Sequence, residues 1–148
     1  MPKLLLAVTL GLLALTARAG YVDPPVQFAK YPAQKVVYHL NSGDAAVEAA
    51  VLNNVLHHMG AVEAGDFALV IHNDAVFALR ESGGVAAVND MLDRLRAKGV
   101  AVRVCNTSLK GRDLDYRSLH GVAVGDLVSS GVAAIADYER RGYVYVRP

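Results

Sequence analysis

Apolar and polar residues follow one another in blocks along the chain, and the blocks predict strands and helices in turn. Short apolar runs rich in β-branched residues are typical of strands buried on both faces of a sheet. Runs of this kind predict strands at residues 35–40, 67–71, 100–105, 126–128 and 143–147. Stretches with apolar residues three or four positions apart predict helices at 45–59, 85–98 and 132–141.

The helical periodicity also predicts which side chains face the core. In the first helix the inward face is expected to carry Val47, Val51, Asn54, Val55 and His58, with Leu52, Leu56 and Met59 beside it and Gly60 as the stop. In the second helix Val88, Met91, Leu92 and Leu95 are expected to face inward. A helical turn is expected at 75–80, and Thr107 or Ser108 is expected to cap an irregular helical segment.

The alternation of strands with helices of ten to fifteen residues decides the fold class. It predicts βαβ units, whose strands are parallel and whose helices cover the sheet. We therefore expect an α/β protein, a three-layer sandwich with a mainly parallel five-stranded sheet.

The first residues carry the pattern of a cleavable signal peptide. Lys3 gives a cationic start, Leu4–Leu15 is an apolar run, and Ala17 and Ala19 supply the small residues of a cleavage site. The run is too short to span a bilayer comfortably, since about 20 apolar residues are needed. We expect residues 1–19 to be a signal peptide cleaved near Ala19 and the protein to be exported to the periplasm. An uncleaved anchor is the alternative.

An extended arm is predicted for residues 20–34, which contain three prolines, and the folded domain is expected at 35–148. The arm carries five large apolar side chains: Tyr21, Val22, Val26, Phe28 and Tyr31. We expect either that these side chains pack on the domain or on a neighbouring subunit, or that the arm is a flexible tether.

Charge and cysteine content exclude several classes of protein. Removing residues 1–19 removes Lys3 and Arg18 from the 15 basic residues and none of the 14 acidic ones, which leaves a net charge of −1. Without a basic stripe we expect no nucleic-acid partner and no membrane partner after cleavage. One cysteine, Cys105, cannot close an internal disulfide. A single thiol is unusual in an exported protein, so Cys105 is either buried and inert or reactive.

Small polar residues gather where the predicted strands end. In an open parallel sheet, ligand sites form outside the carboxyl ends of the strands. The candidates there are Asn41, Ser42, Gly43, His72, Asn73, Asp74, Cys105, Asn106, Thr107, Ser129, Ser130 and Gly131. The serines and asparagines are equally the residues that cap helices in any α/β protein.

Cys105 is the strongest of these candidates. A thiol beside a helix N-terminus, with cations nearby, is favoured as the thiolate. Lys110 and Arg112 are close in sequence, and strand alternation sends Arg103 to the same side as Cys105.

The sequence contains none of the usual motifs of a metal site or a hydrolase. His57 and His58 are adjacent on a helix and point about 100° apart, which suits two ligands of one metal poorly. The chain has no HExxH, CxxC or glycine-rich phosphate loop, and Ser129-Ser130-Gly131 lacks the G-x-S-x-G elbow. We expect no metal site and no cofactor.

Four features of the domain match one known family. His72 closes an apolar strand, Asn54 lies in the first helix, and Arg112 follows Cys105 with six residues between them. The fourth feature is the C-terminal pair of runs, Val128-Ser129-Ser130-Gly131-Val132 and Gly142-Tyr143-Val144-Tyr145-Val146-Arg147-Pro148. With these features, residues 35–148 resemble the DsrE/DsrF-like sulfur-relay proteins, particularly their small exported branch. Asn73 and Asp113 stand where that family usually has glycine, and Ser129 stands where it has proline.

The resemblance implies a flavodoxin-like fold, a homo-oligomer such as a dimer, trimer or hexamer, and a cysteine that carries sulfur as a persulfide. Cys105 would be that cysteine, with Arg112 and Lys110 stabilising the anion and His72 assisting. The pocket would be formed by Asn41, Ser42, Asn73, Asn106, Thr107, Lys110, Ser129 and Ser130. A sulfur donor or acceptor protein would be its partner. The alternative is a non-catalytic binding or oligomerisation module in which Cys105 is buried and structural.

Overall fold

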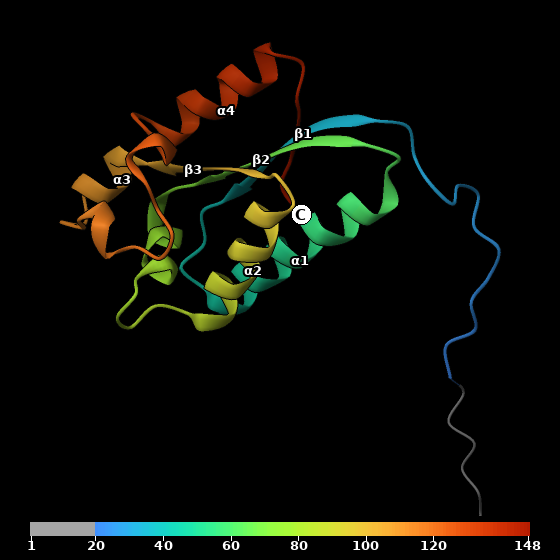
Figure 1. The fold of residues 1–148 in the computed structure, drawn as a ribbon, viewed down its shortest axis with the longest axis horizontal. Coiled ribbons are helices and arrows are strands. Elements are labelled where there is room, and N and C mark those ends of the chain that lie inside the picture. The colour runs from blue at the N-terminus through green and yellow to red at the C-terminus, as the bar shows by residue number, and fades with distance from the viewer. Residues whose placement is uncertain (1–19) are drawn as a thin grey trace, which may run out of the picture.

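Five parallel strands form the centre of the domain (Figure 1). The structure is a computed structural model that describes residues 20–148; the expected signal peptide lies outside the described residues. The strands are β1 (Gln34–Leu40), β2 (Gly65–Ile71), β3 (Ala101–Cys105), β4 (Leu127–Val128) and β5 (Val144–Val146). They lie side by side in the order β4-β3-β2-β1-β5, and every pairing is parallel. The expected α/β class and five-stranded sheet are confirmed.

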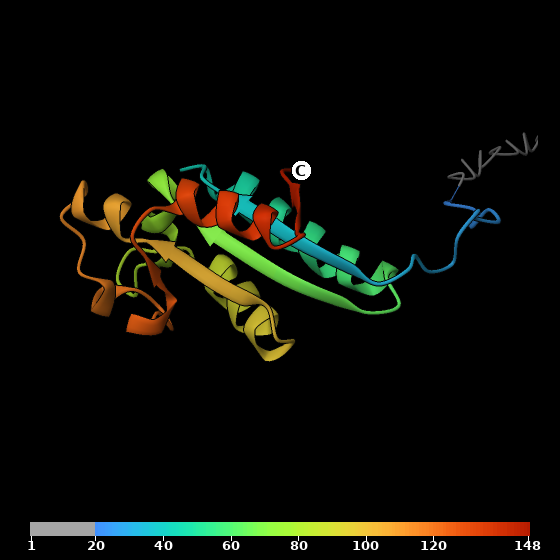
Figure 2. The same ribbon diagram turned by 90° about the horizontal axis from the view of Figure 1, so that it is seen from above.

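Helices cover both faces of the sheet (Figures 1 and 2). Helices α1 (Ala45–Ala61) and α2 (Ala86–Ala97) lie on one face, and α4 (Gly131–Arg140) lies on the other. The two faces carry separate core clusters, the larger one under α1 and α2 and the smaller one, with Ile135 and Tyr138, under α4. Strand β2 is central, and Phe67 to Ile71 are all buried, which explains why its sequence is a continuous apolar run.

Helix α1 differs from the expectation in its length and in its inward face. It begins after Asp44, whose carboxylate accepts hydrogen bonds from the backbone N–H groups of Ala46 and Val47. It then passes through Gly60 and ends at Ala61, so the expected stop at Gly60 is wrong. Its buried residues are Glu48, Val51, Leu52 and Val55, whereas Val47 and Asn54 are exposed. The expectation for those two residues is wrong because the buried stripe is rotated towards Glu48.

The remaining elements lie close to their expected positions. The expected turn at 75–80 is the 3-10 helix η1 (Asn73–Leu79). In the segment after β3, Cys105 itself occupies the cap position of the short helix α3 (Asn106–Lys110), so Thr107 and Ser108 lie inside the helix and neither caps it. Two further 3-10 turns, η2 (Tyr116–Ser118) and η3 (Val124–Asp126), lead to β4.

Residues 20–33 extend away from the domain (Figures 1 and 2). Tyr31 makes an isolated parallel bridge to Val62. The apolar side chains of the segment stay exposed, from 47% at Tyr31 to 85% at Tyr21, so they do not pack on their own domain. Among residues 20–148, no helix is long and apolar enough to cross a membrane.

Candidate functional site

Strand register brings His72 and Cys105 together at the carboxyl edge of the sheet. The last aligned pair of β2 and β3 is Ile71 with Val104. His72 directly follows β2, and Cys105 is the last residue of β3. Gly131, the first residue of α4, packs against both. A Cβ added there would lie 2.9 Å from the His72 Cβ and 3.2 Å from the Cys105 Cβ. The start of α4 therefore closes over the two side chains, and only glycine fits without a shift.

The Cys105 thiol is buried, yet its surroundings lower its pKa. The residue is 4% exposed, and this burial raises the pKa of its thiol. Interactions with the Ser108 side chain and with the backbone of Gly131, Ser108 and Thr107 outweigh burial and hold the pKa of Cys105 below its ordinary value. Cys105 precedes the first residue of α3 and lies against Gly131 at the start of α4.

Ser108 connects the thiol to the end of strand β2. Its Oγ accepts a hydrogen bond of 2.8 Å from the backbone N–H of Asn73, so its own hydroxyl proton is free to point at Cys105. Asn73 has a φ of 56°, in the left-handed region that asparagine tolerates better than most residues. This backbone conformation turns the N–H of Asn73 towards Ser108.

A second imidazole lies behind His72. The rings of His39 and His72 stack with centroids 4.4 Å apart, and His39 Nδ1 is 2.8 Å from the hydroxyl of Tyr145 on strand β5. Burial, His72 and Arg147 lower the pKa of His39 to about 4. Burial, Arg112 and Arg147 lower the pKa of His72 as well. Both rings are therefore neutral at pH 7, and the Nε2 atom of each is buried without a hydrogen-bond partner in the described part of the chain.

Arg112 is bound to other groups than the thiol. Its guanidinium donates to Asn73 Oδ1 at 2.5 Å, to Asp74 Oδ1 at 2.5 Å and to the carbonyl oxygen of Ser108 at 3.3 Å. These contacts tie the loop after β2 to helix α3. The position of Arg112 suits it to holding Asn73 and Ser108 in place around Cys105.

The other expected pocket residues divide between several places. Asn106 and Lys110 are exposed on α3, and the Thr107 hydroxyl donates to the carbonyl oxygen of Ser129 at 2.7 Å. Asn41 and Ser42 line a hollow of about 250 Å³ together with His39 and Arg147. The strand-end residues therefore do not form one common pocket.

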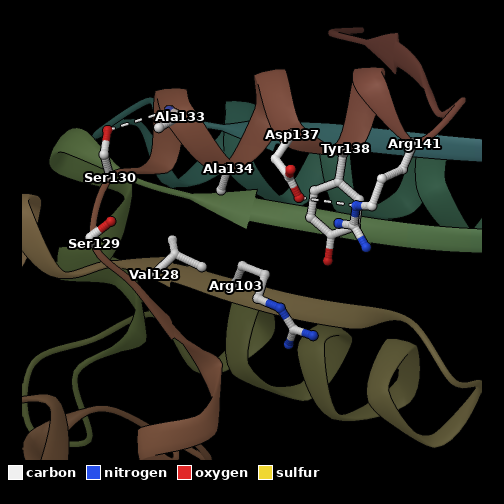
Figure 3. A pocket seen from close by; sticks show the side chains of 9 residues that line it. All are labelled: Arg103, Val128, Ser129, Ser130, Ala133, Ala134, Asp137, Tyr138 and Arg141. Carbon is white, nitrogen blue, oxygen red and sulfur yellow. Dashed lines mark hydrogen bonds and ion pairs between the residues drawn. The ribbon is translucent and has the colours of Figure 1, made fainter.

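Ser129 and Ser130 line a different hollow, a groove of about 470 Å³ between α4 and strands β3 and β4 (Figure 3). Ser130 also caps α4, because its Oγ accepts from the backbone N–H of Ala133. Figure 3 shows Asp137, Tyr138 and Arg141 reaching from α4 towards the sheet, where Arg103 projects from β3.

Several site residues were not among the sequence candidates: His39, Ser108, Tyr138, Asp137, Arg141 and Tyr145. Alternation along β1 and β2 could have indicated His39, because residues 39, 70 and 72 face the same side of the sheet. Ser108 lies three positions after Cys105, in the first turn of the helix that Cys105 caps. A side chain at this position can reach back to the cap residue. The residues of α4 carry no such local signal.

Chemically, the arrangement offers a buried thiol with a lowered pKa, an imidazole at the end of the neighbouring strand and the hydroxyl of Ser108. Within residues 20–148, no group of three or more His, Cys, Asp or Glu side chains could hold a metal ion.

Comparison with known proteins places these residues in a family context. The model of the DsrE/DsrF-like family matches residues 34–148. No curated protein matches the chain. A protein of unknown function, MTH1491 from Methanobacterium thermoautotrophicum, is 27% identical, with a TM-score of 0.68 over 78% of this chain and 99% of that one. The ychN protein from E. coli is 22% identical, with a TM-score of 0.62 and the same coverage, and this likeness concerns the fold.

Proposed function

The chain belongs to the DsrE/DsrF-like family, and we propose that it handles sulfane sulfur in the periplasm, with Cys105 accepting a sulfur atom as a persulfide and passing it on. The observation that carries the proposal is the position of Cys105 at the carboxyl edge of the sheet, between the starts of α3 and α4 and beside His72. The Ser108 side chain and three backbone N–H groups lower the pKa of a thiol that burial alone would raise. A structural cysteine does not require such an arrangement.

The transfer step is a thiol exchange that needs no outside oxidant. The Cys105 thiolate attacks the terminal sulfur of a donor R–S–SH, forming a new S–S bond as the donor's S–S bond breaks. The electron pair leaves on the donor sulfur as R–S⁻, and the proton of the transferred SH group remains on the new Cys105 persulfide. Release to an acceptor thiolate is the same exchange in reverse.

His72 and Arg112 have separate roles in this proposal. His72 is neutral at pH 7 because burial and nearby arginines lower its pKa, so its ring can accept the proton as the thiol ionises or as the persulfide reacts. Arg112 is a positioning residue, since it binds Asn73, Asp74 and the Ser108 carbonyl.

Mass spectrometry of the mature protein after incubation with polysulfide tests the proposal. We expect the wild-type protein to gain the mass of one sulfur atom, reversibly with dithiothreitol, and Cys105→Ser to gain none. The absence of an adduct on the wild type, or an equal adduct on both proteins, overturns the proposal.

A non-catalytic module with a buried, structural Cys105 is the second candidate function. The observation that favours it is the 4% exposure of Cys105. It predicts that the native thiol resists iodoacetamide at every pH below unfolding, whereas the first proposal predicts alkylation well below pH 8.5, about the ordinary pKa of a cysteine.

The proposed function includes export and self-association. The pattern of residues 1–19 supports cleavage near Ala19, and the exposed apolar side chains of the arm support contact with another subunit. Expression of the full chain in a bacterium, followed by fractionation and N-terminal sequencing, tests export; retention of Met1 in the cytoplasm contradicts it. Light scattering on the mature chain with and without residues 20–30 tests assembly, and a monomer in both cases contradicts it.

A further inference from the structure

We propose that the groove between α4 and strands β3 and β4 binds a low-molecular-weight sulfane-sulfur donor by its carboxylate group, with Arg103 and Arg141 as the recognising side chains. This inference rests on the proposed function, which it deepens by naming the class of donor: an anionic organic persulfide.

The groove has the size and the polar lining of a small-molecule site. Its volume of about 470 Å³ falls within the roughly 300–1,000 Å³ that is usual for such sites. The floor is the sheet face of β3 and β4, and the wall is one side of α4, where Ala133 and Ala134 leave room because their side chains are small (Figure 3).

Two guanidinium groups stand at the groove, and neither is fully used by the protein. Arg103 donates to the carbonyl oxygen of Val102 at 2.9 Å and is 3.9 Å from a carboxylate oxygen of Asp126. Arg141 makes a 3.0 Å ion pair with Asp137 and lies 4.2 Å from the ring centroid of Tyr138. A guanidinium has five N–H donors, so each retains several for a ligand.

The charge of the groove favours an anion. Asp137 is the carboxylate that lines it, and Asp137 is shared by Arg140 and Arg141. Of the residues that line the groove, Arg103 and Arg141 are cations and Asp137 is the carboxylate. Arginine binds a carboxylate through two parallel hydrogen bonds, which fixes the orientation as well as the position of the bound group.

One end of the groove lies beside Cys105, although Cys105 itself does not line it. Cys105 pairs with Val128 across the sheet, and Val128, Ser129 and Ser130 line one end of the groove. Arg103 is two residues before Cys105 on the same face of β3, a separation of about 6–7 Å along a strand. A donor held by its carboxylate at Arg103 and Arg141 therefore extends its sulfur towards Cys105.

The burial of Cys105 restricts what can reach it. With 4% of the residue exposed and the start of α4 packed against it, the sulfur is reached by a narrow terminal S–SH group more easily than by a cysteine on the surface of a folded partner. A flexible small molecule with an anionic tail meets both requirements.

Binding measurements on Cys105→Ser isolate recognition from sulfur transfer. The probe is reduced glutathione, a thiol with two carboxylate groups. Glutathione diethyl ester, in which both carboxylates are esterified and carry no charge, is the comparison. Binding of each is measured by calorimetry and by NMR shifts of residues at the groove. We expect glutathione to bind more tightly than the ester, and Arg103→Gln or Arg141→Gln to weaken binding at least about 10-fold. Arg140→Gln is the matched control, because Arg140 pairs with the same Asp137 but lies outside the groove.

The outcomes distinguish failure of the groove assignment from failure of the proposed sulfur transfer at Cys105. Equal binding of acid and ester, no binding of glutathione, or an equal loss with Arg140→Gln overturns the groove assignment. A second series uses glutathione persulfide and the wild-type thiol. If glutathione binds Cys105→Ser as expected but wild-type Cys105 gains no sulfur, the proposed function fails and the groove assignment stands. If sulfur transfer proceeds and is unchanged by Arg103→Gln and Arg141→Gln, the groove assignment fails and the function stands.

Discussion

His39 and His72 stack on the face of the sheet beneath α4, with their ring centroids 4.4 Å apart and their planes inclined by 16°. Burial is the main reason why the pKa of His39 falls to about 4, because a charged imidazole loses its hydration there. The neighbouring His72 ring and the guanidinium of Arg147 lower it further, since a second positive charge at this distance would be repelled.

Replacing His39 by Phe is expected to reduce the fall in the free energy of unfolding that acid causes. A histidine whose folded pKa is lowered contributes stability that is present above its unfolded pKa, about 6.5, and that disappears as the pH falls towards 4. His39→Phe keeps an aromatic ring in the stack but removes this proton. Urea unfolding from pH 7 to pH 4 should show a smaller decline in the free energy of unfolding than the wild type. A decline equal to that of the wild type would contradict the lowered pKa; His57→Gln, at an exposed position of α1, is the control.

Ser108→Ala is expected to slow alkylation of Cys105 at neutral pH. The substitution removes the hydroxyl that donates to the sulfur, so the pKa of the thiol rises and less thiolate is present. A hydrogen bond worth about 0.5–1.5 kcal/mol corresponds to a roughly 2- to 10-fold fall in rate at pH 7. Rates of iodoacetamide reaction against pH measure it. Ser118→Ala, whose hydroxyl is bonded to Asp115, should leave the profile unchanged; an unchanged profile for Ser108→Ala would refute the role of its hydroxyl.

Gly131→Ala is expected to destabilise the fold and displace the start of α4. The new Cβ would come within 2.9 Å of the His72 Cβ and 3.2 Å of the Cys105 Cβ, and relieving such crowding costs about 1–3 kcal/mol. The same shift moves the Gly131 N–H away from the sulfur and raises the pKa of Cys105. Denaturant midpoints and alkylation profiles measure the two effects. Gly60→Ala, in a helix with nothing within 4 Å, should be neutral or stabilising; a neutral Gly131→Ala would show that the contact is not close.

Glu48→Gln is expected to remove a loss of stability that the wild type undergoes as the pH rises from 4.5 through 7. Glu48 is buried, both carboxylate oxygens lack a hydrogen-bond partner in the described structure, and burial together with Asp44 raises its pKa to about 7. An acid with a raised folded pKa contributes stability that is present below its unfolded pKa, about 4.5, and lost as the pH rises through 7.

The wild type should therefore lose up to about 3 kcal/mol of stability between pH 4.5 and pH 8 through this group alone, and Glu48→Gln should not. Chemical unfolding at half-unit pH intervals measures the difference. Glu63→Gln, on the surface, should follow the wild type; the same pH-dependence in Glu48→Gln would contradict the buried proton.

At two positions where the chain departs from the family pattern, the structure shows a backbone conformation that the sequence did not reveal. Asn73 and Asp113, where the family usually has glycine, are the non-glycine residues with positive φ among residues 20–148, at 56° and 52°. Asparagine and aspartate tolerate this conformation because their short polar side chains bond locally. At both positions the backbone therefore has a conformation that glycine also adopts readily.

The sequence by itself determined the fold class, the five strands and the position of Cys105 at a strand end, because these depend on the local spacing of apolar residues and on where each run stops. It also placed His72 near Cys105, since both follow buried parallel strands.

Only the tertiary structure decided which groups touch the thiol and which do not. Gly131 and Cys105 are 26 positions apart in the sequence and meet because α4 returns across the sheet. Arg112 is closer in sequence but binds the loop after β2. The rotation of α1 that buries Glu48 and exposes Val47 follows from how the helix packs against its neighbours. Register, helix orientation and side-chain contacts between distant segments are set by packing in three dimensions, and no local pattern encodes them.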